Sequence, residues 1–167
     1  MKAKLIKMAK KYGVCSRLSD LQRCPDNAAA LVNLLYRHWD FVAAKNFPTK
    51  AFLRQYKDDL APLGVLVENP TAVIKQEKVA LFDSAATVEA TAYESRVIYA
   101  AGISSVAVRA RHYSLVVVEA AGDATVDVEM SEGARVIVTL RDRAQLLHEV
   151  NNKNFKLINR NAVPNQQ

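Results

Sequence analysis

Residues 104–130 read SSVAVRARHYSLVVVEAAGDATVDVEM, and this stretch decides the fold. Three times in it, a small residue is followed two positions later by a valine, with further apolar residues at alternate positions. A short turn then separates each run from the next. Because the side chains of a β-strand point alternately to opposite faces, each run predicts one strand with a buried face and an outward face.

The same unit repeats along the chain from residue 79 to residue 140, and its valines mark the period. These anchor valines follow one another at intervals of 9, 9, 9, 10, 10 and 10 residues: Val79, Val88, Val97, Val106, Val116, Val126 and Val136. The outward side chains differ between neighbouring units, since every second strand carries mainly Thr, Ser, Glu or Asp there. A flat meander gives no reason for this difference, whereas a coil with two strands per turn places every second strand on the same face.

We therefore assign the chain to the α+β class, with N-terminal helices followed by a parallel β-solenoid of two strands and 18–20 residues per turn. The predicted segments are a helical docking or capping module over residues 1–70, a solenoid repeat domain over 71–149 and a polar C-terminal tail over 150–167. Intertwined β-helices of three chains use valine repeats of similar length. A trimeric β-helix, in which each chain supplies one wall, is therefore the alternative fold.

One outward face of the predicted solenoid is apolar. Six residues form it, with Ile98, Val117 and Ile137 stacked as a ladder that is edged by Arg96, Leu115 and Arg135. Contiguous apolar surface of this kind is typical of a covered or interacting face. We expect either the N-terminal helices or further copies of the chain to pack on it. The second arrangement would give a homo-oligomer, either a dimer or a trimer.

The first seventy residues have helical spacing in place of alternation. Apolar residues recur every three to four positions over residues 28–44, with Asp26 as the expected N-cap. A second helix is expected to begin after Thr49 and to end at Pro62. Residues 2–11 predict a short basic amphipathic helix. A protein partner would bind through this helical module.

The net charge of +6 is divided unevenly along the chain. It is +7 over residues 1–60, −4 over residues 61–149 and +3 over residues 150–167. Affinity for phosphates or for an acidic partner would therefore lie at the ends, where Lys7, Lys10 and Lys11 are the candidate contacts. A solvated basic helix explains the same lysines equally simply. A nucleic-acid partner is thus kept as an alternative and is not favoured.

The sequence has no motif for catalysis or for a cofactor. Its three histidines, His38, His112 and His148, are far apart and lack metal-ligand spacing, and Gly-rich phosphate loops and Gly-x-Ser-x-Gly elbows are absent. Cys15 and Cys24 are expected to be ordinary thiols. We predict no catalytic residue, no metal and no cofactor, and hence a protein that is not an enzyme.

The hydropathy pattern predicts no membrane partner, because no apolar run approaches the roughly 20 residues that span a bilayer. Lysines interrupt the first eleven residues, where a signal peptide needs an unbroken apolar stretch. We expect the protein in the cytoplasm, or associated with a virion if it is encoded by a phage.

Two groups of motifs carry a resemblance to known proteins. Residues 84–93 and 122–129 resemble the Ala-Thr-Val-x-Ala-Tyr arrays of β-solenoid proteins. Residues 45–54, followed by residues 63–67, resemble the helical lead-in of small proteins from gut-bacterial prophages and mobile elements. The resemblance implies a structural protein of a virion or a mobile element, and no catalytic residue transfers with it.

These observations favour a non-enzymatic structural or interaction protein that presents a rigid solenoid and oligomerises. Two alternatives belong to other classes. One is a polymer-forming scaffold similar to bactofilins, in which solenoids stack end to end. The other is a nucleic-acid-associated module that uses the basic N-terminus.

Overall fold

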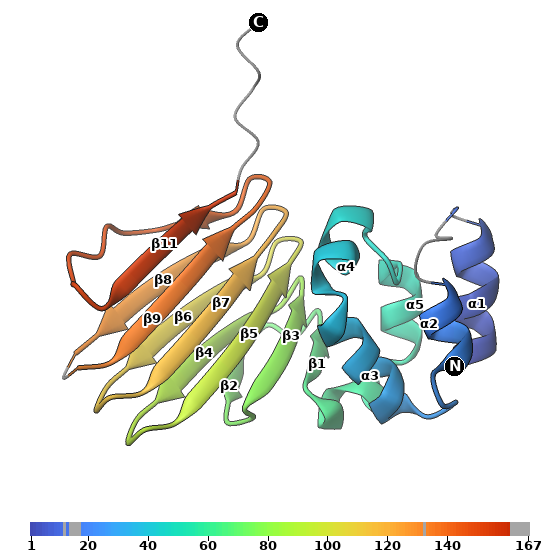
Figure 1. Cartoon of the computed structure of the whole chain (residues 1–167), viewed down its shortest axis with the longest axis horizontal. Coiled ribbons are helices and arrows are strands. Elements are labelled where there is room, and N and C mark those ends of the chain that lie inside the picture. Colours follow the sequence, from blue (N-terminus) through green and yellow to red (C-terminus); the bar gives the residue numbers. More distant parts are fainter. Residues whose placement is uncertain (12, 14–17, 132, 161–167) are drawn as a thin grey trace, which may run out of the picture. The chain divides into compact units, whose positions relative to one another are not determined.

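The computed structural model describes residues 1–11, 13, 18–131 and 133–160 of the chain (Figure 1). They divide into two compact units, Met1–Val65 and Leu66–Gln167. The first is helical and the second consists mainly of parallel strands. Cys15 lies outside the described residues, as do residues 161–167 of the expected tail.

The helical unit contains, among its described residues, six α-helices and one 3₁₀ turn. They are α1 (Lys2–Lys11), α2 (Leu18–Arg23), α3 (Ala28–Arg37), α4 (Trp39–Lys45), α5 (Lys50–Gln55), α6 (Lys57–Leu60) and η1 (Ala61–Leu63). The single helix expected over residues 28–44 is divided at His38, which lies between α3 and α4.

The N-cap of α3 is Asn27 and not the expected Asp26. Asn27 directly precedes the first helical residue, has extended backbone angles, and its side-chain oxygen accepts a hydrogen bond from the Ala30 amide at 2.8 Å. Asp26 instead accepts a hydrogen bond from the Lys2 amide at 3.3 Å. The expected cap at Thr49 is confirmed, since its hydroxyl accepts a hydrogen bond from the Phe52 amide at 3.4 Å.

Among the described residues, the solenoid contains eleven strands. They are β1 (Val65–Val67), β2 (Ala72–Ile74), β3 (Lys78–Phe82), β4 (Ala85–Ala90), β5 (Ser95–Ala101), β6 (Ser105–Ala110), β7 (Leu115–Ala120), β8 (Thr125–Met130), β9 (Arg135–Leu140), β10 (Gln145–Leu146) and β11 (Phe155–Asn159). Odd-numbered strands form one sheet in the order β1-β3-β5-β7-β9-β11, here called sheet A. Even-numbered strands form sheet B in the order β10-β8-β6-β4-β2 (Figure 1).

The coil advances by about one strand per sheet for every twenty residues. In sheet B, Val108 pairs with Val88 on one side and with Val128 on the other, and both pairs of strands are parallel. In sheet A, Val118 pairs with Ile98 and with Val138. This register confirms the parallel β-solenoid with two strands per turn. Because one chain supplies both sheets, the intertwined three-chain alternative does not describe this fold.

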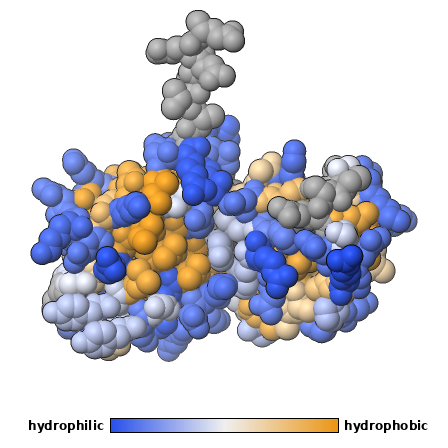
Figure 2. Space-filling model, viewed as in Figure 1, coloured by the Kyte–Doolittle hydropathy of each residue, from blue (hydrophilic) through white to orange (hydrophobic). Residues whose placement is uncertain are grey.

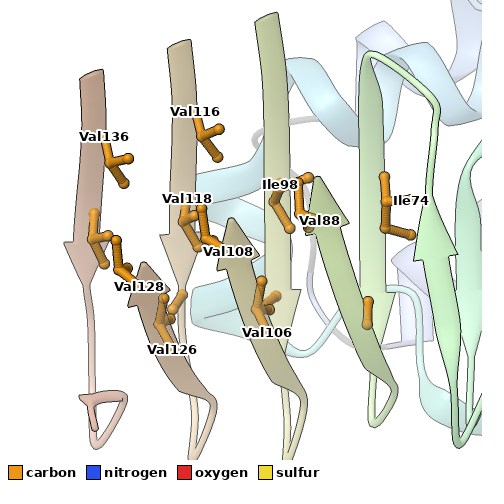
Figure 3. Packing of buried hydrophobic residues seen from close by; sticks show 14 of the residues in the cluster. Ile74, Val88, Ile98, Val106, Val108, Val116, Val118, Val126, Val128 and Val136 are labelled. Carbon is orange, nitrogen blue, oxygen red and sulfur yellow. The ribbon is translucent and has the colours of Figure 1, made fainter. Parts of the chain in front are cut away.

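The solenoid core is a set of columns of β-branched residues between the two sheets. Figure 3 shows Val106, Val108 and Val126 of sheet B extending toward the side chains of sheet A, among them Val116 and Val118. All five are at most 1% exposed. Full burial of each such side chain stabilises the fold by roughly 1.5–3 kcal/mol. The predicted inward columns of the repeat are thus confirmed for these strands.

One strand departs from the predicted pattern. In β5 the residue buried in the core is Ile98, which is 0% exposed and pairs with Val118, whereas the anchor Val97 faces outward and is only half-buried. The assignment of Ile98 to the outward ladder is therefore wrong by one residue. The observed register buries Ile98 and Ala100, while the predicted one would have placed the bulky, hydroxyl-bearing Tyr99 between the sheets.

Both ends of the core are covered by partly buried apolar residues of the same unit. Leu66 and Ala72 pack on it before β3, and Leu146, Val150 and Phe155 pack on it after β9. Strand β11 lies within the segment expected to be a polar tail, and it pairs along its length with β9. The solenoid therefore extends to residue 159, and its last core turn is not left open.

The inward and outward assignment of β7 can be tested by two neighbouring substitutions. Val116→Asp is expected to lower the free energy of unfolding by several kcal/mol, since it places an unpaired charge at a position with 0% exposure. Val117→Asp, at a half-buried outward position, should cost much less. Urea denaturation of both variants measures the difference, and equal losses would contradict the assignment.

Candidate interaction site

An apolar row runs along the outer face of sheet A. The backbone register aligns Val97 with Val117 and Val117 with Ile137, and we call these three residues the outer ladder. Their outward side chains are half-buried, and beside them Leu115 is 36% exposed. Figure 2 shows hydrophobic surface gathered on this side of the solenoid. The face therefore offers a flat apolar surface on a rigid sheet.

Most of the predicted members of this face lie where the pattern placed them. Val117 and Ile137 belong to the outer ladder, and Leu115 pairs with Arg135 in the neighbouring row, with both residues exposed. Val97 takes the place that was predicted for Ile98. The size of Tyr99, two residues after Val97, is the sequence signal that could have identified this strand as shifted.

Arg96 also differs from its predicted place at the edge of the ladder. Its backbone pairs with Val116, whose side chain is in the core, so Arg96, the second residue of β5, has an inward register position. The guanidinium forms an ion pair with Glu94 at 2.9 Å, and the Arg96 side chain is only 12% exposed. The side chain of Arg96 is therefore paired with the turn before β5 and is not part of the apolar face.

The outer ladder is flanked by a basic row on one side and by an ion pair on the other. On one side lies the row of Leu115 and Arg135, and on the other lies Glu119, which pairs in register with Thr139. Glu119 forms an ion pair with Arg141 at 3.6 Å, and both side chains are about one-fifth to one-quarter exposed. The face is thus apolar along its middle, basic at one flank and mixed at the other.

The outer face of sheet B is polar, as the alternation predicted. Arg109 lies between Glu89 and Glu129 in register and approaches each carboxylate at 3.7 Å. These side chains are 52–68% exposed, so the pairs are solvated and contribute little to stability. The two outer faces of the solenoid therefore differ in kind, and only that of sheet A is apolar.

A second feature lies at the turns that lead from sheet B to sheet A. Tyr93 and Tyr113 occupy equivalent places in successive turns, and their rings stack with centroids 5.8 Å apart and planes inclined by 11°. They are 78% and 65% exposed. Gly133 holds the same place in the next turn, where an added Cβ would lie 2.5 Å from Cε1 of Tyr113. We call Tyr93, Tyr113 and Gly133 the tyrosine corner.

The backbone of the tyrosine corner is strained. Ala92, Tyr93, His112 and Tyr113 have φ values of 50°, 66°, 49° and 59°. Residues with a side chain cost roughly 1–2 kcal/mol each in this left-handed conformation, which glycine adopts freely. A stacked ring pair returns only about 0.5–1.5 kcal/mol. At Tyr93 and Tyr113 the side chains are therefore less stable choices than glycine would be, and burial does not compensate for them.

The candidate phosphate contacts of the helical unit lie on α1. Leu5 and Ala9 are buried in the core of this unit, while Lys7, Lys10 and Lys11 are exposed. This arrangement confirms the predicted amphipathic helix. It does not distinguish a solvated basic face from a binding face.

The described residues contain no group of three His, Cys, Asp or Glu side chains that could hold a metal ion. His38 lies 3.1 Å from a carboxylate oxygen of Asp20, and Nδ1 of His112 lies 2.8 Å from the hydroxyl of Thr91. Cys24 is a free, half-buried thiol. In the part of the chain that the structure describes, no helix is both long and apolar enough to cross a bilayer.

The fold and these surfaces define the chain as a β-solenoid with an N-terminal helical unit. Comparison with protein-family models, with curated proteins and with solved structures finds no match.

Glu94 joins the tyrosine corner to β5 and should titrate at low pH. Its carboxylate accepts a hydrogen bond from the Thr91 amide at 3.0 Å and pairs with Arg96, and these contacts lower the pKa of Glu94 below its ordinary value. Because the folded pKa is depressed, the stabilisation is complete above the ordinary pKa of the side chain and is lost as the pH falls through the folded value.

Arg96→Gln should raise the pKa of Glu94 partway toward its ordinary value and leave the effect of the Thr91 amide in place. Carboxyl chemical shifts followed by NMR between pH 2 and pH 7 measure the change. An unchanged titration in the variant would show that the guanidinium does not act on this carboxylate.

Proposed function

We propose that this chain is a non-enzymatic structural or interaction protein that forms a symmetric dimer through the outer face of sheet A. The observation that carries the proposal is the outer ladder of Val97, Val117 and Ile137, an apolar row on the outside of a hydrogen-bonded sheet. Apolar surface gains free energy when it is removed from water, and a flat sheet face is covered best by another sheet.

The charges beside the ladder favour a second copy as the partner. A twofold axis that runs along the direction of strand stacking would lay the Arg135 flank of one copy over the Glu119 flank of the other. Each dimer would then contain two such pairings, since a twofold interface uses the same patch on both subunits. The ladders would meet in the centre, with the two sheets about 10 Å apart.

The solenoid is also suited to binding with little loss of conformational freedom. Strand β7, in the middle of sheet A, is paired along its length on both sides, and its inward residues are 0% exposed. Such a strand is already ordered before a partner arrives, so association does not have to order the surface. A rigid surface of this kind fits a structural role better than a catalytic one.

End-to-end polymerisation, the alternative similar to bactofilins, has less support. The last strand of sheet A, β11, has Lys156 along its length and Arg160 directly after it, and both are exposed. Charged side chains on an edge strand oppose the addition of another strand. The resemblance of residues 45–54 and 63–67 to the helical lead-in of prophage and mobile-element proteins leads us to propose that the dimer belongs to a virion or a mobile element.

The mass of the protein in solution tests the proposal. By size-exclusion chromatography with light scattering, the wild type should have twice the chain mass of 18.5 kDa. Val117→Asp should give the monomer mass, because it places a charge in the middle of the ladder. The matched control is Ala107→Asp, also half-buried and outward but on sheet B, which should remain a dimer.

Three results would contradict the dimer. A wild type that stays monomeric at hundreds of micromolar would remove the second copy as partner. A trimeric mass would exclude the twofold arrangement. A Val117→Asp variant that unfolds more easily but keeps its mass would point to cover supplied from within the chain.

A further inference from the structure

We propose that the tyrosine corner is a binding site for the neutral sugar rings of a polysaccharide, with Tyr93 as the stacking platform. The inference does not depend on the dimer, since it concerns the turns between the sheets and not the outer ladder. It rests on three properties of the corner: side chains that folding does not require, a ring that is held in place, and polar groups beside the rings that can orient a sugar.

The two tyrosines are not explained by the needs of the fold. Tyr93 and Tyr113 have φ values of 66° and 59°, and the equivalent Gly133 shows that glycine satisfies the same turn. Both rings are mostly in contact with water, so they add little to the core. Strained residues that are retained without a packing role are concentrated at functional sites.

The stack holds the outer ring in a defined position. The ring of Tyr113 lies against the backbone of Gly133, where no side chain intervenes, and the ring of Tyr93 lies nearly parallel to that of Tyr113. With a 78% exposed side chain, Tyr93 presents ring surface to solvent at the end of this stack. A ring fixed in this way binds a flat ligand without losing much rotamer freedom.

The groups beside the rings offer contacts of the kind that orient a sugar. The hydroxyl of Thr91 lies 2.8 Å from Nδ1 of His112. Together with the phenol groups of the two tyrosines, these side chains offer hydroxyl and imidazole contacts that can orient a polar ring. Arg96 is matched by the carboxylate of Glu94, whereas Arg111, in the same turn as Tyr113, is exposed, so the salt dependence of binding distinguishes a sugar from a phosphate-bearing ligand. The C–H faces of a pyranose ring are attracted to the negative face of an aromatic ring, and this contact needs no charge.

Native gel electrophoresis of the full chain through gels that contain dextran, laminarin, xylan or galactomannan provides the test. We expect at least one of these neutral polymers to retard the wild type, and titration calorimetry with that polymer then gives its Kd. Tyr93→Gly should raise the Kd at least tenfold. Its unfolding midpoint should stay the same or rise, because glycine relieves the left-handed strain.

Tyr93→Gly is thus expected to weaken binding without lowering the unfolding midpoint, and this combination separates a role in binding from a role in packing. Tyr93→Trp, which keeps an aromatic platform, should bind within a few-fold of the wild type. The control is Ile103→Ala, which removes a 72% exposed apolar side chain from the turns at the other end of the strands and should leave the Kd unchanged.

Four results would overturn the proposal. The first is retardation by none of the four polymers, and the second is an unchanged Kd in Tyr93→Gly. The third is a Tyr93→Gly variant that binds weakly only because it unfolds at a lower temperature. The fourth is binding to polyuridylic acid, but to none of the sugars, that weakens steeply with salt, since this would assign the corner to single-stranded nucleic acid.

Discussion

The alignment of β-branched side chains from turn to turn is the constraint on which the rest of the structure depends. Val88, Val108 and Val128 lie in one register on sheet B, and Ile98, Val118 and Val138 lie in one register on sheet A. A slip of one residue in the pairing of a strand would move all its side chains to the opposite face. The core therefore fixes the register of each strand, whereas the spacing between paired strands varies, with 19 residues from Val79 to Ile98 and 20 from Ile98 to Val118.

That constraint leaves only some positions for function. Inward residues serve packing, and the outward rows and the turn residues are open to other demands. The outward residues of the two sheets differ: those of sheet B form solvated ion pairs around Arg109, whereas those of sheet A form the outer ladder. At the tyrosine corner, even the backbone conformation that suits glycine is occupied by Tyr93 and Tyr113. The candidate sites are thus the places where the residue differs from what folding alone would select.

The architecture could be predicted from the sequence because a two-strand turn leaves a distinct pattern, in which outward chemistry recurs at every second strand. The register of β5 could not be derived from valine spacing alone, since Val97 and Ile98 are equally suitable core residues by hydrophobicity. What decides between them is the volume of the residue two positions further on, Tyr99 or Ala100. The tyrosine corner was missed for another reason: its stack joins residues twenty apart at left-handed positions, and neither property is visible in a linear pattern.

The twenty-residue register has a consequence for how such a chain can change in length. A segment such as residues 125–144 begins and ends at equivalent points of the coil, because Thr125 pairs with Gln145. Tandem duplication of that segment would add one complete layer, lengthen the molecule by about 4.8 Å, and present each neighbouring layer with the surface it already meets. The gene of such a protein can therefore alter the reach of its product in fixed increments by unequal recombination, without a new core having to evolve.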